Sequence, residues 1–145
     1  MADTSAGFRF RGTISGGLGA VPTIQRLLFK DTETLTKGDM LNLETGEVDL
    51  GAVGDTGFIG IAMETKAGTD STTYIDVITN PDAIYGVYDA SARLKGATLD
   101  ITGATGAQSV TTSSSKNFVV WAPSSATEET LVVFNIGKAY YNTGQ

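Results

Sequence analysis

The feature that most constrains the fold is a series of short apolar runs, each closed by glycine, asparagine or aspartate. From Ile24 onward these runs recur at intervals of about 8–15 residues, which is typical of β-sandwiches and β-barrels. Strands bounded by turn-forming residues explain this spacing better than helices do. We therefore predict an all-β protein, a small β-barrel or sandwich of short antiparallel strands. The expected strands are 23–30, 39–44, 47–50, 57–64, 72–78, 83–89, 97–102, 116–122 and 129–136.

The composition agrees with this fold class. A chain of 145 residues favours one domain, and its 41% of apolar residues can supply a core. The 18 glycines and only 3 prolines suit a chain with many turns. Two short stretches, 89–96 and 124–130, have patterns compatible with a helix, but neither is long enough to form the body of the fold.

Residues 1–23 differ from the rest because they hold few apolar residues and many glycines. We expect an extended N-terminal arm, flexible when unbound, followed by a single β-rich domain over 24–145. Within the arm, Phe8 and Phe10 alternate with two arginines in the sequence FRFRGTI. This period-two pattern suits a strand that adds to the sheet edge of a partner.

Several classes of function are excluded by what the sequence lacks. It has no histidine and no cysteine, which removes Ser-His-Asp triads, thiolate nucleophiles, disulfides and almost every zinc or copper site. The net charge of −6 is spread along the chain and argues against nucleic acid. No apolar run approaches the roughly 20 residues of a membrane helix. The first residues do not have the pattern of a secretory signal, so we expect synthesis in the cytoplasm.

Three glycine-rich or acidic features have simpler interpretations than a reactive site. The segment SGGLGA (15–20) is followed by Pro22 in place of a helix, so it is not a phosphate loop. Asp70 is a single carboxylate among hydroxyl groups. Calcium binds 6–8 oxygen ligands, so these residues are a poor set of ligands for it. Paired carboxylates could serve glycoside hydrolysis, but most acids lie at turns or on the polar phase of a strand. The candidate acids are Asp39, Glu44, Glu47, Asp49, Asp76 and Asp89. We expect no enzyme activity, no catalytic residue, no cofactor and no metal.

Exposed aromatic side chains could form a platform for a sugar or a base. The candidates are Tyr74, Tyr85, Tyr88, Tyr140 and Tyr141. Trp121 follows three apolar residues, which favours a place in the core or in an interface.

Residues 56–77 form a β-hairpin with a polar tip in our interpretation. The first strand contains Gly60 between Ile59 and Ile61. A glycine inside a strand commonly marks a bulge or a place where another backbone comes close. Nothing in the hairpin requires a ligand.

Several segments between Leu35 and Asp89, including part of this hairpin, resemble the head decoration, or cement, proteins of tailed bacteriophages, the lambda type. The resemblance covers about Leu35 to Asp89, together with the glycine-containing character of the arm. Residues 91–145 depart from it and form a longer tail with at least two more strands. The segments that carry the resemblance are 40–50, Gly60-Ile61-Ala62, Asp70-Ser71-Thr72-Thr73, 74–78 and 83–88.

The resemblance implies a small β-barrel that trimerises on the outside of an icosahedral capsid, with an arm that adds a strand to the major capsid protein. We therefore expect a virion protein of the capsid exterior, synthesised in the host cytoplasm, that stabilises the shell by bridging major capsid protein subunits. The expected capsid-binding residues of the arm are Phe8, Arg9, Phe10, Arg11 and Ile14. The expected oligomer or capsid surface is Thr69, Asp70, Ser71, Thr72 and Thr73.

Three alternatives remain open. The chain could be a carbohydrate-binding or other surface-recognition module of a virion. It could be a tail-tube or fibre protein. A hydrolase with two carboxylates is the third, and it requires two acids within about 5–10 Å of each other in a cleft.

Overall fold

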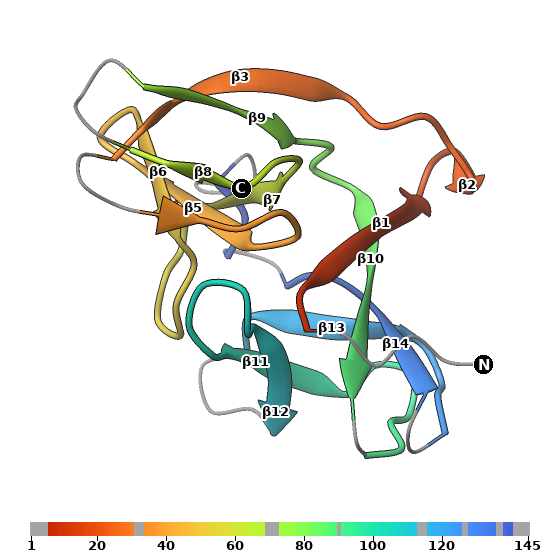
Figure 1. Ribbon diagram of the computed structural model, residues 1–145. Coiled ribbons are helices and arrows are strands. Elements are labelled where there is room, and N and C mark those ends of the chain that lie inside the picture. Colours follow the sequence, from red (N-terminus) through yellow and green to blue (C-terminus); the bar gives the residue numbers. More distant parts are fainter. Residues whose placement is uncertain are drawn as a thin grey trace.

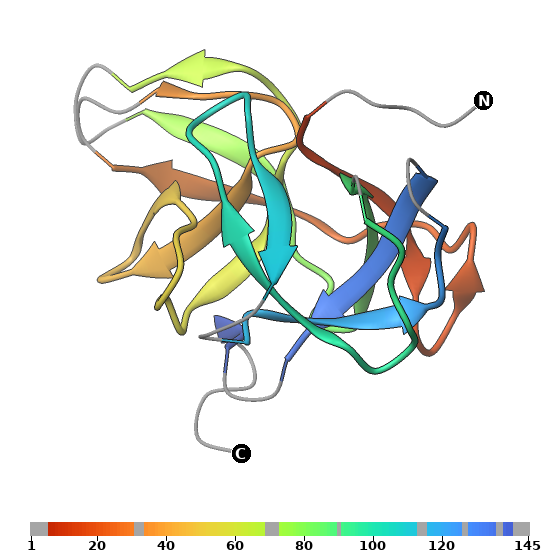
Figure 2. The same ribbon diagram turned by 90° about the horizontal axis from the view of Figure 1, so that it is seen from below.

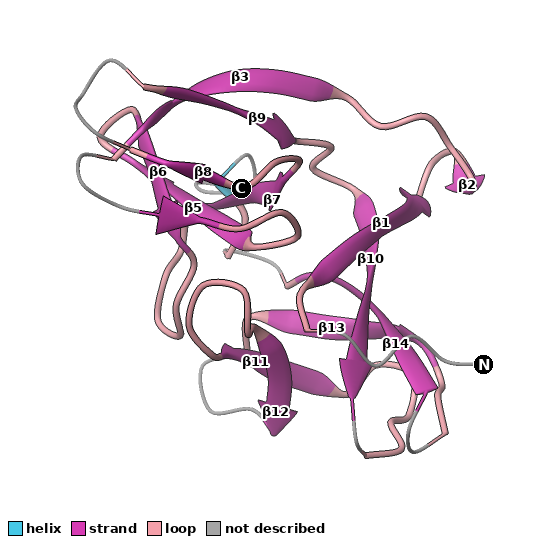
Figure 3. Ribbon diagram, in the orientation of Figure 1, coloured by secondary structure: helices cyan, strands magenta, loops and turns pink. Residues whose placement is uncertain are grey.

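The computed structural model describes residues 6–30, 34–68, 73–89, 91–112, 116–125, 128–135 and 138–140. Within these ranges the chain is built almost entirely from strands and loops: none of them contains an α-helix, and the one helical piece is a short 3-10 turn at Tyr140, drawn in cyan (Figure 3). The prediction of an all-β fold is confirmed. The two stretches with helix-compatible patterns are not helical where they are described: bends, turns and a bridge follow residue 90, and a strand begins at Glu128.

Seven strands form one antiparallel sheet, which occupies the lower and right part of Figure 1. Strands from the two ends of the chain flank the same neighbour, because β10 lies between β1 and β14. The order across the sheet is β12 (Ser109–Thr112), β11 (Thr98–Thr102), β13 (Phe118–Ala122), β14 (Glu128–Phe134), β10 (Ala83–Asp89), β1 (Phe8–Thr13) and β2 (Gly17–Leu18).

Five further strands close into a barrel above this sheet in Figure 1. Their order is β3 (Ile24–Phe29), β6 (Glu47–Leu50), β5 (Met40–Glu44), β7 (Phe58–Ala62) and β9 (Tyr74–Ile78), with β9 pairing back to β3. The β3–β6 pair is parallel, unlike the purely antiparallel arrangement that we expected. A two-stranded ribbon of β4 (Thr34–Leu35) and β8 (Lys66–Ala67) accompanies the barrel.

The β5–β6 hairpin shows how local sequence sets this geometry. Its two-residue connection is Thr45-Gly46, and both residues have positive φ, 51° and 84°. Positive φ at both central positions produces the turn whose twist matches that of the flanking strands. The tight hairpin predicted at Thr45-Gly46 is confirmed, and its register pairs Glu44 with Glu47.

Apolar side chains fill two clusters. One lies inside the barrel and includes Phe29, Val48 and Ile75. The other lies between barrel and sheet and joins Phe58 of β7 to Phe118 and other sheet residues. Because the second cluster takes residues from both parts, the sheet and the barrel share one apolar contact surface.

Gly60 allows β7 to pass close to its neighbours. Its φ is 153°, and a Cβ atom at this position would lie 1.6 Å from the carbonyl oxygen of Ile78 in β9. The register of the β5–β7 pair shifts at the same place, between Leu41 and Asn42. Both reasons for a glycine within a strand, a bulge and a close backbone approach, therefore apply here.

Within the predicted N-terminal arm, Phe8–Thr13 and Gly17–Leu18 are paired into the seven-stranded sheet. β1 pairs with β10 over five residue pairs and with β2 on its other side. Phe8 is only 2% exposed and contacts Phe118, with ring centroids 5.4 Å apart. The segment contains few apolar residues, but two of them meet a core made by the C-terminal strands, which offsets the entropy lost on ordering.

Two buried polar side chains fasten the sheet to the barrel. The carboxylate of Asp39 accepts hydrogen bonds from the N–H of Gly106 and the hydroxyl of Thr105, in the β11–β12 loop. The side-chain amide of Gln108 bonds the backbone of Met40 and donates to the carbonyl of Gly51. Both side chains are almost fully buried, so these bonds replace water that folding removed.

Candidate functional site

Exposed apolar side chains are concentrated in one segment, residues 14–24, which we call the 14–24 segment. It connects β1 through β2 to the start of β3, and β2 lies at the periphery of the molecule in both views (Figures 1 and 2). Val21 is 86% exposed and Leu18 is 65% exposed, with Ile14 and Ile24 about half exposed. The segment contains no charged residue. A segment with four such side chains is a typical place for contact with another protein.

The backbone of the 14–24 segment is held in place by its neighbours. Asp82 accepts hydrogen bonds from the N–H and the hydroxyl of Ser15, at 3.0 and 2.6 Å. Asn80 accepts from the N–H of Thr23 at 2.6 Å, and the carbonyl of Thr23 accepts from Thr79. Fixing the backbone in advance reduces the entropy lost when the apolar side chains bind.

Gly12 allows the segment to fold back on β1. A Cβ atom there would lie 2.2 Å from the carbonyl oxygen of Gly17, on β2. Only glycine fits such an approach, so the sequence RGTISGGLG forms a tight β-ribbon.

The pKa of the Asp82 carboxyl group is lowered. The hydrogen bond from the Ser15 hydroxyl lowers the pKa of this carboxyl group, and the backbone N–H of Ser15 adds to that effect against the contribution of burial. Because the charged form is the one that holds the segment, its anchoring persists at mildly acidic pH.

The four predicted arm residues of FRFR lie on β1 and point to different places. Phe8 is in the core, and Phe10 borders a groove of about 220 Å³ between β1 and the barrel, which Ile61, Met63 and Ile78 also line. Arg9 and Arg11 form ion pairs with Glu129 of β14, at 3.1 and 2.7 Å. These arginines therefore contact the neighbouring sheet surface.

Opposing effects act on the pKa of the Glu129 carboxyl group. Burial alone would raise its pKa, but the hydrogen bonds and charges of Arg11 and Arg9 outweigh burial and hold the pKa below its usual value. The cluster therefore fastens β1 across β10 to β14 at neutral pH.

Four of the five residues predicted for the polar hairpin tip, Thr69, Asp70, Ser71 and Thr72, lie outside the described residues. The fifth, Thr73, is partly buried, and its carbonyl accepts a hydrogen bond from Phe29. Its role as an oligomer or capsid surface stays a prediction.

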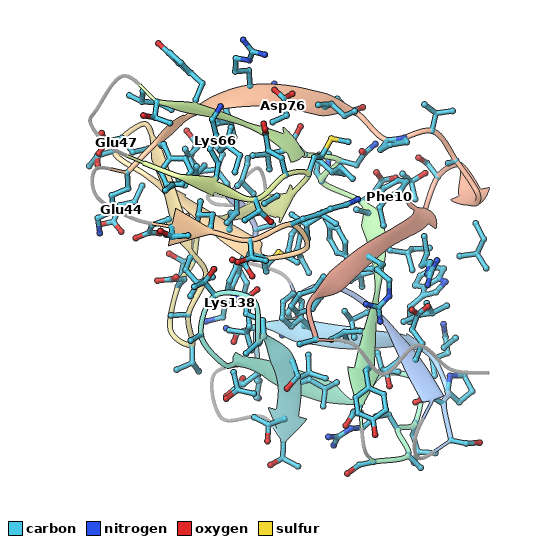
Figure 4. The ribbon with its side chains drawn as sticks, in the orientation of Figure 1. Phe10, Glu44, Glu47, Lys66, Asp76 and Lys138 are labelled. Atoms are coloured by element: carbon cyan, nitrogen blue, oxygen red, sulfur yellow. The ribbon has the colours of Figure 1, made fainter. Side chains whose placement is uncertain are left out.

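The candidate acids are distributed over the molecule. Asp39 accepts the hydrogen bond from Thr105 that joins sheet and barrel. Asp76 forms an ion pair with Arg26, and Asp89 forms one with Arg93. Glu44, Glu47 and Asp49 gather at the end of the β5–β6 hairpin, where Asp49 pairs with Lys30. Figure 4 shows Glu44 and Glu47 side by side at this end, on the opposite side of the molecule from Phe10.

Within the described ranges, no three acidic, histidine or cysteine side chains gather in a way that could hold a metal ion. The same part of the chain contains no helix long and apolar enough to cross a membrane.

The aromatic residues do not form one common platform. Tyr85 is fully buried between the sheet and the barrel, Tyr74 is half exposed on β9, and Tyr140 is half exposed near the C-terminus. Trp121 is partly buried, with the ammonium group of Lys95 4.5 Å from its ring centroid. Tyr141 lies outside the described residues.

Sequence reasoning missed Leu18, Val21 and Ile24 as surface residues. The sequence did contain a signal for their exposure, since apolar residues spaced by glycine and proline in a stretch without charged residues cannot all enter a core. Ile14 was predicted to be a contact residue, and the structure places it in the same segment with its side chain 47% exposed.

No family model matches the chain, and no curated protein matches it either.

Proposed function

We propose that this chain is a structural virion protein that binds the outside of an icosahedral phage capsid and stabilises it by bridging major capsid protein subunits. The observation that carries the proposal is the 14–24 segment, which has four exposed apolar side chains and a backbone held by hydrogen bonds to Asp82 and Asn80. The resemblance of 35–89 to head decoration proteins supports it, and that region supplies most of the barrel.

The mechanism is binding free energy. Each bound copy buries the apolar side chains of the 14–24 segment against the shell. Because the copies bind the assembled shell and not separated subunits, they shift the equilibrium towards the shell by mass action. β1 is paired within this chain, so the attachment uses side chains of the 14–24 segment and not a strand donated by FRFR.

The test is co-sedimentation with capsids of the source phage that have been prepared without this protein. The double variant Leu18→Ser/Val21→Ser removes the two most exposed side chains of the segment. Burying each contributes about 1–2 kcal/mol, so the pair should weaken binding roughly 30-fold or more. The matched control is Val53→Ser/Leu94→Ser, which removes an exposed valine and leucine elsewhere.

The control variant should co-sediment like the unchanged protein. Equal loss of binding in both double variants would mean that the segment has no special role. No co-sedimentation of the unchanged protein would refute the proposed function itself.

A further inference from the structure

A second surface lies beside β5 and the loop before β7, where three distant parts of the chain meet around a hollow of about 440 Å³. We call it the Tyr140 hollow. It is lined by Asn42 and Glu44 of β5, by the loop 54–57 and by Tyr140. Its volume lies within the range of about 300–1,000 Å³ that is usual for small-molecule sites.

Tyr140 is brought to the hollow by the strand beside it. The carbonyl of Lys138 accepts a hydrogen bond from Phe58, the first residue of β7, and Ala139 is buried beside that strand. Tyr140 is 42% exposed. It therefore offers part of an aromatic surface next to the loop that precedes β7.

Asn42 and Asp55 offer hydrogen-bonding groups of both kinds. Asn42 is 4% exposed, and its Oδ1 accepts a hydrogen bond from the N–H of Gly57, which leaves Nδ2 as its remaining donor. Asp55 accepts the N–H of Ala52 through Oδ2, and no hydrogen bond within the described part of the chain engages Oδ1. Burial, with smaller contributions from Asp49 and Glu44 and against the hydrogen bond from Ala52, raises the pKa of Asp55.

We propose that the Tyr140 hollow binds a carbohydrate, with a pyranose ring stacked on Tyr140 and its hydroxyl groups bonded to Asp55, Glu44 and Asn42. A sugar hydroxyl is both a donor and an acceptor, so it can donate a hydrogen bond to a carboxylate oxygen and accept one from the Asn42 amide. The C–H face of the ring covers the aromatic surface. An ammonium or guanidinium group suits the two carboxylates but has no acceptor for the Asn42 donor, which favours the sugar.

The hollow is separate from the 14–24 segment, so the inference does not rest on the proposed function. The test is titration of the isotope-labelled full chain, followed by amide NMR shifts. The probes are the methyl glycosides of glucose, galactose, mannose, N-acetylglucosamine and rhamnose, and Nα-acetyl-arginine amide. At least one glycoside should cause saturable shifts at Gly54, Thr56 and Gly57, with smaller or no shifts from the arginine derivative.

Matched variants assign the binding to this site. Tyr140→Ala and Asp55→Asn should each weaken binding of that glycoside tenfold or more. Tyr74→Ala, which removes another half-exposed tyrosine, should leave binding unchanged. Overlay of the remaining amide signals checks that each variant is folded.

Three results would overturn the inference. They are no saturable shifts with any of the five glycosides, saturable binding that Tyr140→Ala leaves unchanged, and binding of the arginine derivative alone. The last result would assign the hollow to a basic side chain of a protein partner.

Discussion

Replacement of Gly60 by alanine should be among the most damaging small substitutions in this protein. The added Cβ would lie 1.6 Å from the carbonyl oxygen of Ile78, whereas a carbon and a carbonyl oxygen in close contact are about 3.3 Å apart. β7 and β9 would have to separate by roughly 1.7 Å, which disrupts the pairing of Ile61 with Ile78. Overpacking costs about 1–3 kcal/mol, and strained backbone dihedral angles cost a further ~1–3 kcal/mol.

We therefore expect Gly60→Ala to lower the free energy of unfolding by about 2–6 kcal/mol, out of the ~5–15 kcal/mol usual for a domain. The assay is urea unfolding at 25 °C followed by circular dichroism. Gly46→Ala is the control, since Gly46 also has positive φ (84°) but a Cβ there would meet no atom within 4 Å. The control should lose only about 1–2 kcal/mol. Equal losses in the two variants would refute the argument from close backbone approach.

Two further predictions concern buried polar groups. Tyr85→Phe should raise the free energy of unfolding by about 0.5–1.5 kcal/mol in urea titrations, because the buried hydroxyl has no hydrogen-bond partner within the described residues; a clear loss would indicate a partner. Glu129→Gln should lower it by about 1–3 kcal/mol at pH 7. Since the pKa of Glu129 is lowered in the folded state, this contribution is present above the unfolded value of 4.5 and is lost as pH falls through the folded value. Thermal unfolding of both proteins from pH 7 to pH 3 should show the difference shrink, and a constant difference would contradict the ion-pair explanation.

Local patterns predicted most strands correctly. All nine expected strands are present, from 23–30, which contains Ile24–Phe29, to 129–136, which overlaps Glu128–Phe134. Each combines alternating apolar residues with a glycine, asparagine or aspartate turn, so the information lies within about ten residues. Gly60 was also interpreted correctly, because a glycine inside an apolar strand commonly marks a bulge or a close backbone approach.

Features that depend on distant residues could not be predicted. The core position of Phe8 depends on Phe118, which lies 110 residues further along the chain. The parallel β3–β6 pair depends on the path of the whole barrel and not on its local sequence. β12 was missed since Ser109–Thr112 is mostly polar, and it forms only because β11 presents a sheet edge beside it.

The two candidate sites show the same contrast between features of local sequence and features that depend on distant residues. The 14–24 segment could be recognised in part, as shown by Ile14, because exposure follows from composition within one stretch. The Tyr140 hollow could not, because Asn42, Asp55 and Tyr140 meet only through the fold.

Cryo-electron microscopy of the particle that carries this protein tests the central claim most directly. The account predicts density for the seven-stranded sheet and the barrel on the outer surface of the capsid. Ile14, Leu18, Val21 and Ile24 should lie against the major capsid protein across a joint between its subunits. A particle whose shell lacks this protein, or one in which the 14–24 segment faces solvent while another surface makes the attachment, would contradict it.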